Sequence, residues 1–141
     1  MARIMALDVG EATVGVAISD PLGITAQPIT TIRRRSFKDD LRAIADLAAS
    51  YEVQTIVVGL PLRMSGIAGS AAEEALSFAE RVRKAVSLPV ETWDERLSTV
   101  QAERSLIEAD LSRRRRREVI NQVAAAIILQ AYLDSRPRTE P

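Results

Sequence analysis

Hydrophobic positions follow two different periods along the chain, and their order predicts alternating strands and helices. Short apolar runs bounded by turn-forming residues are typical of strands, and they predict strands at residues 3–9, 13–19, 24–32, 55–59 and 88–93. Apolar residues spaced three and four apart predict helices at residues 37–48, 70–86 and 118–133, and composition predicts a further helix at residues 98–108. Ser36 and Ser70 are the predicted caps of the first two helices, the second with Glu73 at capping-box spacing.

This order of elements predicts an α/β fold built on a mixed five-stranded sheet with helices on both faces. The first two strands form an antiparallel hairpin, and Pro28 suits an edge position for the third. The strand at residues 88–93 is expected to run parallel to the first strand. We predict a single domain over residues 1–141, with a polar break at residues 110–117 and a flexible tail at residues 135–141.

The composition agrees with one packed domain and narrows its chemistry. The 141 residues are 47% hydrophobic and 27% charged, which is enough apolar material to bury a core. Cysteine and histidine are both absent. Their absence excludes disulfides, thiol nucleophiles, Ser-His-Asp triads and metal sites built from cysteine or histidine. Hydrolytic chemistry would therefore fall to carboxylates and a hard cation held by oxygen atoms.

The charge balance excludes a global basic field but leaves local ones. There are 19 basic and 19 acidic residues, and arginines are concentrated at residues 33–35 and 113–117. Aromatic residues make up only 4% of the chain, so base stacking cannot be the main way of binding a nucleic acid. No apolar run approaches the ~20 residues that span a bilayer, and no secretory leader is visible. We therefore expect a cytoplasmic protein without membrane contact.

Several polar side chains stand where the predicted elements would bring them together. Asp8 and Glu95 follow strands expected to be parallel, Gly59 ends a third, and such carboxyl ends gather at one edge of a sheet. Asn121 lies at the margin of the apolar stripe of the last helix, and Gly15 is expected to let a ligand approach the backbone. Each also has a structural interpretation: Asp8 in a turn, Glu95 in a solvated cap, Asn121 in a hydrogen bond at the helix margin. The convergence of strand ends favours a site.

Four blocks of the chain resemble the YqgF family, whose members are described as Holliday junction resolvases and as pre-16S ribosomal RNA nucleases. The resemblance extends over residues 3–133, and the blocks agree in order and spacing. The segment DERLST after VVGLP is the most specific part of it. The four blocks are LDVGEATVGVAISD, VVGLPLRMSG, DERLSTVQAE and VINQVAAAIILQAYLD.

The resemblance implies a ribonuclease H-like fold and a metal-dependent endonuclease that uses Mg²⁺ or Mn²⁺. Its three acidic positions fall here on Asp8, Glu95 and Asn121, where the family usually has Asp at the third position. Two divalent ions can activate water and neutralise phosphate charge without histidine. Asp8 would be the bridging ligand, Glu95 would hold the second ion or position water, and Asn121 would be a weak terminal ligand.

Arginines and one loop are the predicted contacts to the nucleic-acid backbone. Arg96 lies beside Glu95, and the resemblance adds Thr99 and the loop at residues 59–61. The arginine run at residues 113–117 precedes the helix that carries Asn121. This position favours phosphate binding over a merely solvated loop. The predicted nucleic-acid-binding residues are Arg96, Thr99, Gly59, Pro61, Arg113, Arg114 and Arg116.

Three functions fit these observations. The first is a nuclease acting on structured nucleic acid, either precursor rRNA or branched DNA, as a monomer or a homodimer. The second is a nucleic-acid-binding relative whose catalysis is weakened or lost because Asn121 replaces the usual Asp. The third is an ATPase module of the actin and sugar-kinase type. Those enzymes close two such domains over the nucleotide, so the length of this chain disfavours the third, as does the lack of a P-loop.

Overall fold

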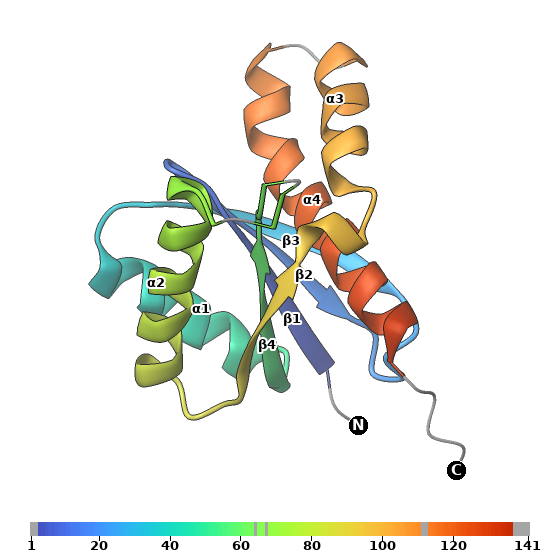
Figure 1. Cartoon of the computed structure of the whole chain (residues 1–141). Helices are drawn as coiled ribbons and strands as arrows, with labels where there is room; N and C mark the ends of the chain where they lie inside the picture. The colour runs from blue at the N-terminus through green and yellow to red at the C-terminus, as the bar shows by residue number, and fades with distance from the viewer. Residues whose placement is uncertain (1–2, 64, 67, 111–112, 137–141) are drawn as a thin grey trace.

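The computed structural model describes residues 3–63, 65–66, 68–110 and 113–136, without the side chains of residues 107–108, 110 and 113–118. Figure 1 shows a central sheet with helices on both of its faces. The strands are β1 (Arg3–Val9), β2 (Thr13–Ser19), β3 (Ala26–Arg33), β4 (Val53–Leu60) and β5 (Val90–Asp94). The helices are α1 (Phe37–Ser50), α2 (Ser70–Ala85), the 3-10 turn η1 (Glu95–Leu97), α3 (Val100–Asp110) and α4 (Arg113–Ser135).

The sheet is mixed, with the strand order β3-β2-β1-β4-β5. Strands β1, β2 and β3 form an antiparallel meander. Strand β4 runs parallel to β1, and β5 runs parallel to β4, as the sequence predicts. Pro28 lies on β3 at the edge of the sheet, where a missing backbone N–H is tolerated. The carboxyl ends of β1, β4 and β5 therefore lie along one edge of the sheet.

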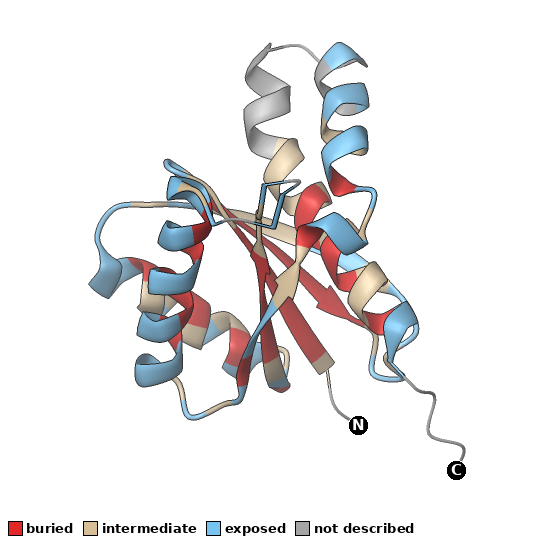
Figure 2. Cartoon of the chain, viewed as in Figure 1, coloured by how far each residue is buried: buried red, intermediate tan, exposed pale blue. Residues whose placement is uncertain are grey.

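Alternation along β1 divides the core into two layers, because successive side chains of a strand point to opposite faces. Met5 and Leu7 pack with residues of α1 and α2 on one face. Ile4 and Ala6 pack with residues of α4 on the other. Figure 2 shows the buried residues on the strands and on the inner sides of these helices. Asp8 continues the series of Ile4 and Ala6, so the fold directs its carboxylate to the α4 side.

Helix α4 lies very close to β2 because the strand has a glycine at the crossing point. A Cβ atom built on Gly15 would lie 1.9 Å from the backbone oxygen of Asn121. The expectation that Gly15 admits a ligand is therefore wrong, since the backbone of α4 fills that space. Ala124 and Ala125, on the next turn, are fully buried. This contact brings the buried face of α4 close to the hairpin of β1 and β2.

The caps of the first two helices differ from one another. Ser36 caps α1 as predicted, because its hydroxyl accepts a hydrogen bond from the Asp39 N–H at 3.1 Å. At α2 the N-cap residue is Gly69 and no side chain caps the helix. Ser70 is the first helical residue, so its predicted role as a cap is wrong.

Two further boundaries depart from the prediction. The third strand begins at Ala26 because the Asp20 carboxylate holds the N–H groups of Ile24 and Thr25 in a turn, at 2.7 and 2.8 Å. A polar break was predicted at residues 110–117, but Asp110 ends α3 and residues 113–117 form the first turns of α4, since arginine has a high helix propensity. The predicted tail lies largely outside the described residues. Within the described part of the chain, no helix is both long enough and apolar enough to cross a membrane.

Candidate active site

Asp8 is a buried carboxylate near the carboxyl end of the central strand. It is 4% exposed, and it pairs across β1 and β2 with Gly15. Apolar residues precede it on the same face, so the sheet itself shields the carboxylate from water. A buried charge of this kind needs a partner, because removing an unpaired carboxylate from water is costly.

Glu95 stands just beyond the end of β5, as the first residue of η1, and is 1% exposed. Space for its carboxylate comes from Gly59 on the neighbouring strand β4. A Cβ atom at Gly59 would lie 3.0 Å from Glu95 Oε2 and 2.8 Å from Ile128 Cδ1. Gly59 thus has a direct part in positioning Glu95, and its contact with substrate stays a prediction.

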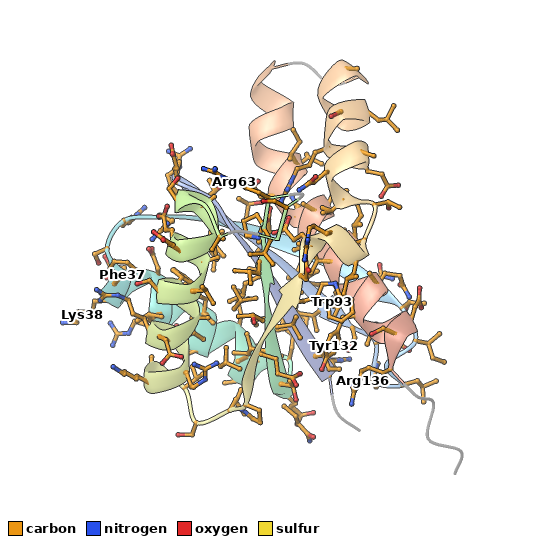
Figure 3. All side chains as sticks on the ribbon, viewed as in Figure 1. Phe37, Lys38, Arg63, Trp93, Tyr132 and Arg136 are labelled. Carbon is orange, nitrogen blue, oxygen red and sulfur yellow. The ribbon has the colours of Figure 1, made fainter. Side chains whose placement is uncertain are left out.

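Strand β5 is anchored to α4 by an aromatic pair just before this turn. The rings of Trp93 and Tyr132 meet edge to face, with centroids 5.6 Å apart, and Figure 3 labels both side chains. The Tyr132 hydroxyl also donates a hydrogen bond to the carboxylate of Glu91, and burial with this bond raises the Tyr132 pKa to about 12. The pair therefore holds the end of β5, just before Glu95, against α4.

Arg104 joins the two carboxylates, and it is the site residue that the sequence reasoning missed. Its Nη2 donates to Asp8 Oδ1 at 2.7 Å, and its Nη1 donates to Glu95 Oε1 at 3.1 Å. The side chain comes from α3, one turn after Val100, which is fully buried. An arginine four residues after an apolar anchor, on the same helix face, was the available signal.

The electrostatics of this cluster are dominated by burial. Burial raises the pKa of Asp8, and the charge and hydrogen bond of Arg104 partly lower it again. Burial also raises the pKa of Glu95, the positive charge of Arg104 lowers it, and the negative charge of Asp8 raises it further. Two acidic groups thus share one basic partner. The net charge of the three ionised groups is negative, which favours the binding of further positive charge.

Asn121 lies beside the hairpin that carries Asp8. Its amide nitrogen donates a hydrogen bond to the Thr13 hydroxyl, and a Cβ atom at Gly10 would lie 3.6 Å from that nitrogen. With the nitrogen engaged by Thr13, the carbonyl oxygen is the atom of this side chain that can ligate a cation. The backbone contact with Gly15 places Asn121 against the strand pair that holds Asp8.

The residues predicted to contact nucleic acid are bonded in different ways. Arg96 follows Glu95, and its guanidinium forms an ion pair with Asp94 at 2.7 Å. Thr99 is exposed, and its hydroxyl donates to Glu103 at 3.1 Å. Pro61 follows β4 at its carboxyl end. The side chains of Arg113, Arg114 and Arg116 lie outside the described residues, so their predicted contacts are not placed.

The donor set suits a hard divalent cation. Asp8 and Glu95 offer carboxylate oxygens and Asn121 a neutral amide oxygen, which is the ligand chemistry that Mg²⁺ and Mn²⁺ prefer. The guanidinium of Arg104 already bonds both carboxylates, so the pair accommodates a shared cation. Among the residues that the structure describes, no three acidic, cysteine or histidine side chains form a metal-binding group. The candidate ligands that remain are the two carboxylates and the amide oxygen of Asn121.

Comparisons with known proteins assign the family. A family model described as RuvX, Holliday junction resolvase, matches residues 2–135. The chain belongs to this family. A RuvX relative from Moorella thermoacetica is 59% identical over 132 residues, covering 94% of each protein. A relative from Desulforamulus reducens is 53% identical over 133 residues, covering 94% of this chain and 97% of the relative. Both carry the name "Putative pre-16S rRNA nuclease".

Beyond the RuvX family, the fold is shared with another solved structure. The structure of T. thermophilus RuvC in complex with a Holliday junction substrate matches with a TM-score of 0.61. The sequences are 11% identical, and the match covers 96% of this chain and 95% of that one. The likeness shows that the fold is ribonuclease H-like, as the sequence resemblance implies.

Proposed function

We propose that this protein is a metal-dependent endonuclease that hydrolyses phosphodiester bonds in structured nucleic acid. The observation that carries the proposal is the meeting of two buried carboxylates, Asp8 and Glu95, at one edge of the sheet, where Arg104 bridges them. Membership of the RuvX family and the names of the curated relatives support the same chemistry.

Asp8, Glu95 and the carbonyl oxygen of Asn121 would hold Mg²⁺ or Mn²⁺. When bound there, divalent ions offset the negative charge of a phosphate and lower the pKa of a coordinated water. The chain supplies the geometry, because Gly59 leaves room for the Glu95 carboxylate and Thr13 orients the Asn121 amide. Burial of Asp8 and Glu95 excludes bulk water, which strengthens their attraction for a cation.

The nucleic-acid backbone would be bound by the arginines near this edge. Arg96 offers a guanidinium beside Glu95, where a substrate phosphate would compete with Asp94 for it. Thr99 and the residues around Gly59 and Pro61 would line the same edge. Arg113, Arg114 and Arg116 would add phosphate contacts from the start of α4, which releases counterions and makes binding sensitive to salt.

Precursor rRNA is the substrate that the names of the curated relatives favour, and branched DNA is the one that the family description favours. A single active site is enough to trim an RNA end, whereas resolving a four-way junction requires two cuts. The protein would act on rRNA as a monomer and on junctions as a homodimer. Both substrates belong in the test.

A three-variant cleavage assay tests the proposal. Wild type, Asp8→Asn and Asn121→Asp are incubated with precursor rRNA and with four-way DNA junctions, with and without Mg²⁺ or Mn²⁺. We expect metal-dependent cutting by the wild type and a loss greater than about 100-fold in Asp8→Asn, since even the partners of metal ligands affect activity by about 10–100-fold. Circular dichroism of Asp8→Asn checks that the variant is folded.

Asn121→Asp decides between an active nuclease and a disarmed relative. It restores a third carboxylate, so we expect tighter metal binding and faster cleavage than in the wild type. Cleavage by Asn121→Asp alone would instead mean that the wild-type chain only binds nucleic acid. Inertness of both proteins on both substrates would contradict the nuclease proposal.

The salt dependence of binding tests the arginine run separately. Replacing Arg114 and Arg116 by Ala should reduce the slope of log affinity against log salt by about 0.7–0.9 for each phosphate that the variant no longer neutralises. Arg42→Ala on α1, the opposite side of the sheet, is the matched control. An unchanged slope in the double variant would mean that the run is solvated surface.

A further inference from the structure

We propose that Arg104 is the internal counter-cation of the Asp8–Glu95 pair and that a divalent cation binds this pair by displacing its guanidinium. Arg104 is thus a positioning residue, because it holds the two carboxylates together until the cation enters. The inference rests on the metal-dependent function proposed above and adds to it the residue that competes with the metal.

The Arg104 guanidinium and a divalent cation cannot both occupy the space between the same two carboxylate oxygens. The Arg104 nitrogens lie 2.7 Å from Asp8 Oδ1 and 3.1 Å from Glu95 Oε1. Magnesium would approach such oxygens to about 2.0–2.1 Å. An ion bound between the same two oxygen atoms would overlap the guanidinium. Arg104 must therefore release Asp8 Oδ1 or Glu95 Oε1 when the ion binds both of these oxygen atoms.

The exposure of the three side chains shows how the exchange can occur. The Asp8 and Glu95 side chains are 6% and 1% exposed, whereas the Arg104 side chain is 26% exposed. Arg104 enters the cluster from the solvent side, on a long stem that can turn outward without disturbing the core. Val100, one turn earlier, keeps α3 packed while the guanidinium moves.

The charges supply the driving force. One guanidinium neutralises one of two adjacent carboxylates, so the ionised cluster keeps an excess of negative charge. A divalent cation neutralises both. Its affinity is then reduced by the free energy of the Arg104 bonds that it must break. Removing the Arg104 charge should raise the affinity for the ion, which is the opposite of what a purely structural ion pair predicts.

Mn²⁺ binding in the absence of nucleic acid tests the proposal. The affinity is measured by electron paramagnetic resonance of free Mn²⁺ for wild type, Arg104→Met, Arg104→Lys and Arg42→Met. Arg42→Met is the matched control, because it also removes one helical arginine, here an exposed one on α1 at the other face of the sheet. We expect Arg104→Met to bind Mn²⁺ at least about tenfold more tightly, since a unit charge at this distance contributes more than that even at an intermediate dielectric. Arg104→Lys should lie close to wild type, and the control should stay within about twofold of it.

A measurement on the wild type covers the case in which Arg104→Met does not fold. The guanidinium resonance of Arg104, assigned by its loss in Arg104→Lys, is followed by NMR during titration with Mg²⁺. Displacement predicts that this resonance shifts and loses its hydrogen-bonded character as Mg²⁺ saturates the site. A resonance that keeps its position while Mg²⁺ binds would overturn the proposal.

The outcomes separate this inference from the proposed function. Equal Mn²⁺ affinities in Arg104→Met and in the control would overturn the role of Arg104 and leave the nuclease proposal intact. Tighter binding in Arg104→Met, together with no cleavage by any variant, would support displacement and contradict the nuclease. Absence of Mn²⁺ binding in every folded variant would overturn both.

Discussion

Two arginines each bridge two acidic side chains in this fold, and they differ in what surrounds them. Arg34 lies on the α1 and α2 side of the sheet and forms ion pairs with Asp40 at 3.7 Å and with Glu74 at 2.9 Å. Arg104 lies on the α4 side and bonds Asp8 and Glu95. Each arginine thus pairs with two acids, but Arg104 hydrogen-bonds both of its partners, whereas the contact between Arg34 and Asp40 is a longer ion pair.

The Arg34 cluster is satisfied by the protein itself. Its guanidinium donates to the Gly10 carbonyl at 2.8 Å and lies over the rings of Phe37 and Phe78. Asp40 also accepts the Arg35 N–H at 3.0 Å and stands in the first turn of α1, where the helix dipole favours a negative charge.

The Arg104 cluster lacks such support. Among the described residues, Arg104 is the donor that bonds the Asp8 and Glu95 carboxylates, and both are buried. From this comparison we infer that an ion pair is a candidate functional site when its acids depend on one removable cation. An acid held also by backbone donors and aromatic packing marks a structural cluster.

The largest expected effect is the loss of stability in Arg34→Met. The substitution leaves Asp40 buried without its cation and removes the bonds that tie α1 and α2 to the first hairpin. We expect the free energy of unfolding to fall by about 3 kcal/mol, the lower end for breaking a buried pair, because Asp40 keeps its backbone donor. Urea unfolding measures the loss. Saturating Mn²⁺ should not restore it, and a full restoration by Mn²⁺ would remove the distinction between the two clusters.

Arg104→Met should cost less, and its cost should depend on pH. Burial holds the folded-state pKa values of Asp8 and Glu95 above the ordinary values of 3.8 and 4.5, and the loss of Arg104 raises them further. Protonated carboxyl groups are tolerated in the folded state at low pH. Stability is lost as the pH rises from the ordinary unfolded-state values towards the raised folded-state values, because over that range the unfolded state ionises while the folded state stays protonated.

The destabilisation by Arg104→Met is therefore expected to be smaller near pH 5 than near pH 8, where it should reach about 2 kcal/mol. Urea unfolding at both pH values, with Arg42→Met as the control, measures it. Mn²⁺ should restore stability at the higher pH by binding the freed carboxylates. A loss that is greater near pH 5 than near pH 8 would contradict the assignment of raised pKa values.

A smaller effect is expected from Gly59→Ala. The new methyl group would press on Glu95 Oε2 and on Ile128, so Glu95 must shift by a few tenths of an ångström. We expect Mn²⁺ affinity to fall about tenfold while the protein stays folded, as for other changes that misplace a ligand. Gly69→Ala is the control, because its methyl group meets the movable end of the Arg63 side chain. Unchanged affinity in Gly59→Ala would remove Glu95 from the metal site.

The smallest effect should come from Glu74→Gln. Glu74 is 47% exposed, and an exposed ion pair contributes little because water and salt screen it. We expect the free energy of unfolding to change by less than about 1 kcal/mol. A larger loss, measured by the same urea titration, would show that the Arg34 cluster depends on its exposed acid as well as on Asp40.

Much of the fold follows from the hydrophobic pattern, because buried strands and amphipathic helices constrain it strongly. The strands β1 and β2 begin and end at the predicted residues, and β3 lies at the edge that Pro28 favours. The local choices of cap and turn were harder to predict. Asp20 extends the turn before β3, and Gly69 takes the place of Ser70 as the cap of α2, since backbone geometry decides between neighbouring residues there.

The candidate site was predictable only in part. Asp8 and Glu95 could be brought together in advance, because parallel strands end at one edge of a sheet. Arg104 was missed, because its spacing from Val100 indicates a helix face but not the contact with Asp8, which lies 96 residues away along the chain. Gly15 was interpreted as leaving room for a ligand. A glycine in the sequence indicates that another group can approach the backbone closely, but it does not identify that group. The tertiary structure alone identifies α4 as the neighbour.

The contact between Gly15 and the Asn121 backbone also limits how the protein can be altered. Any side chain at position 15 would push α4 outward at Asn121, and this part of the helix would move away from the strand pair that holds Asp8. Engineering that repacks this face for greater thermal resistance would therefore change the candidate site as well. A change at this contact requires a matching change in β2 and in α4, so we expect the sequences of the hairpin and of α4 to change together among relatives.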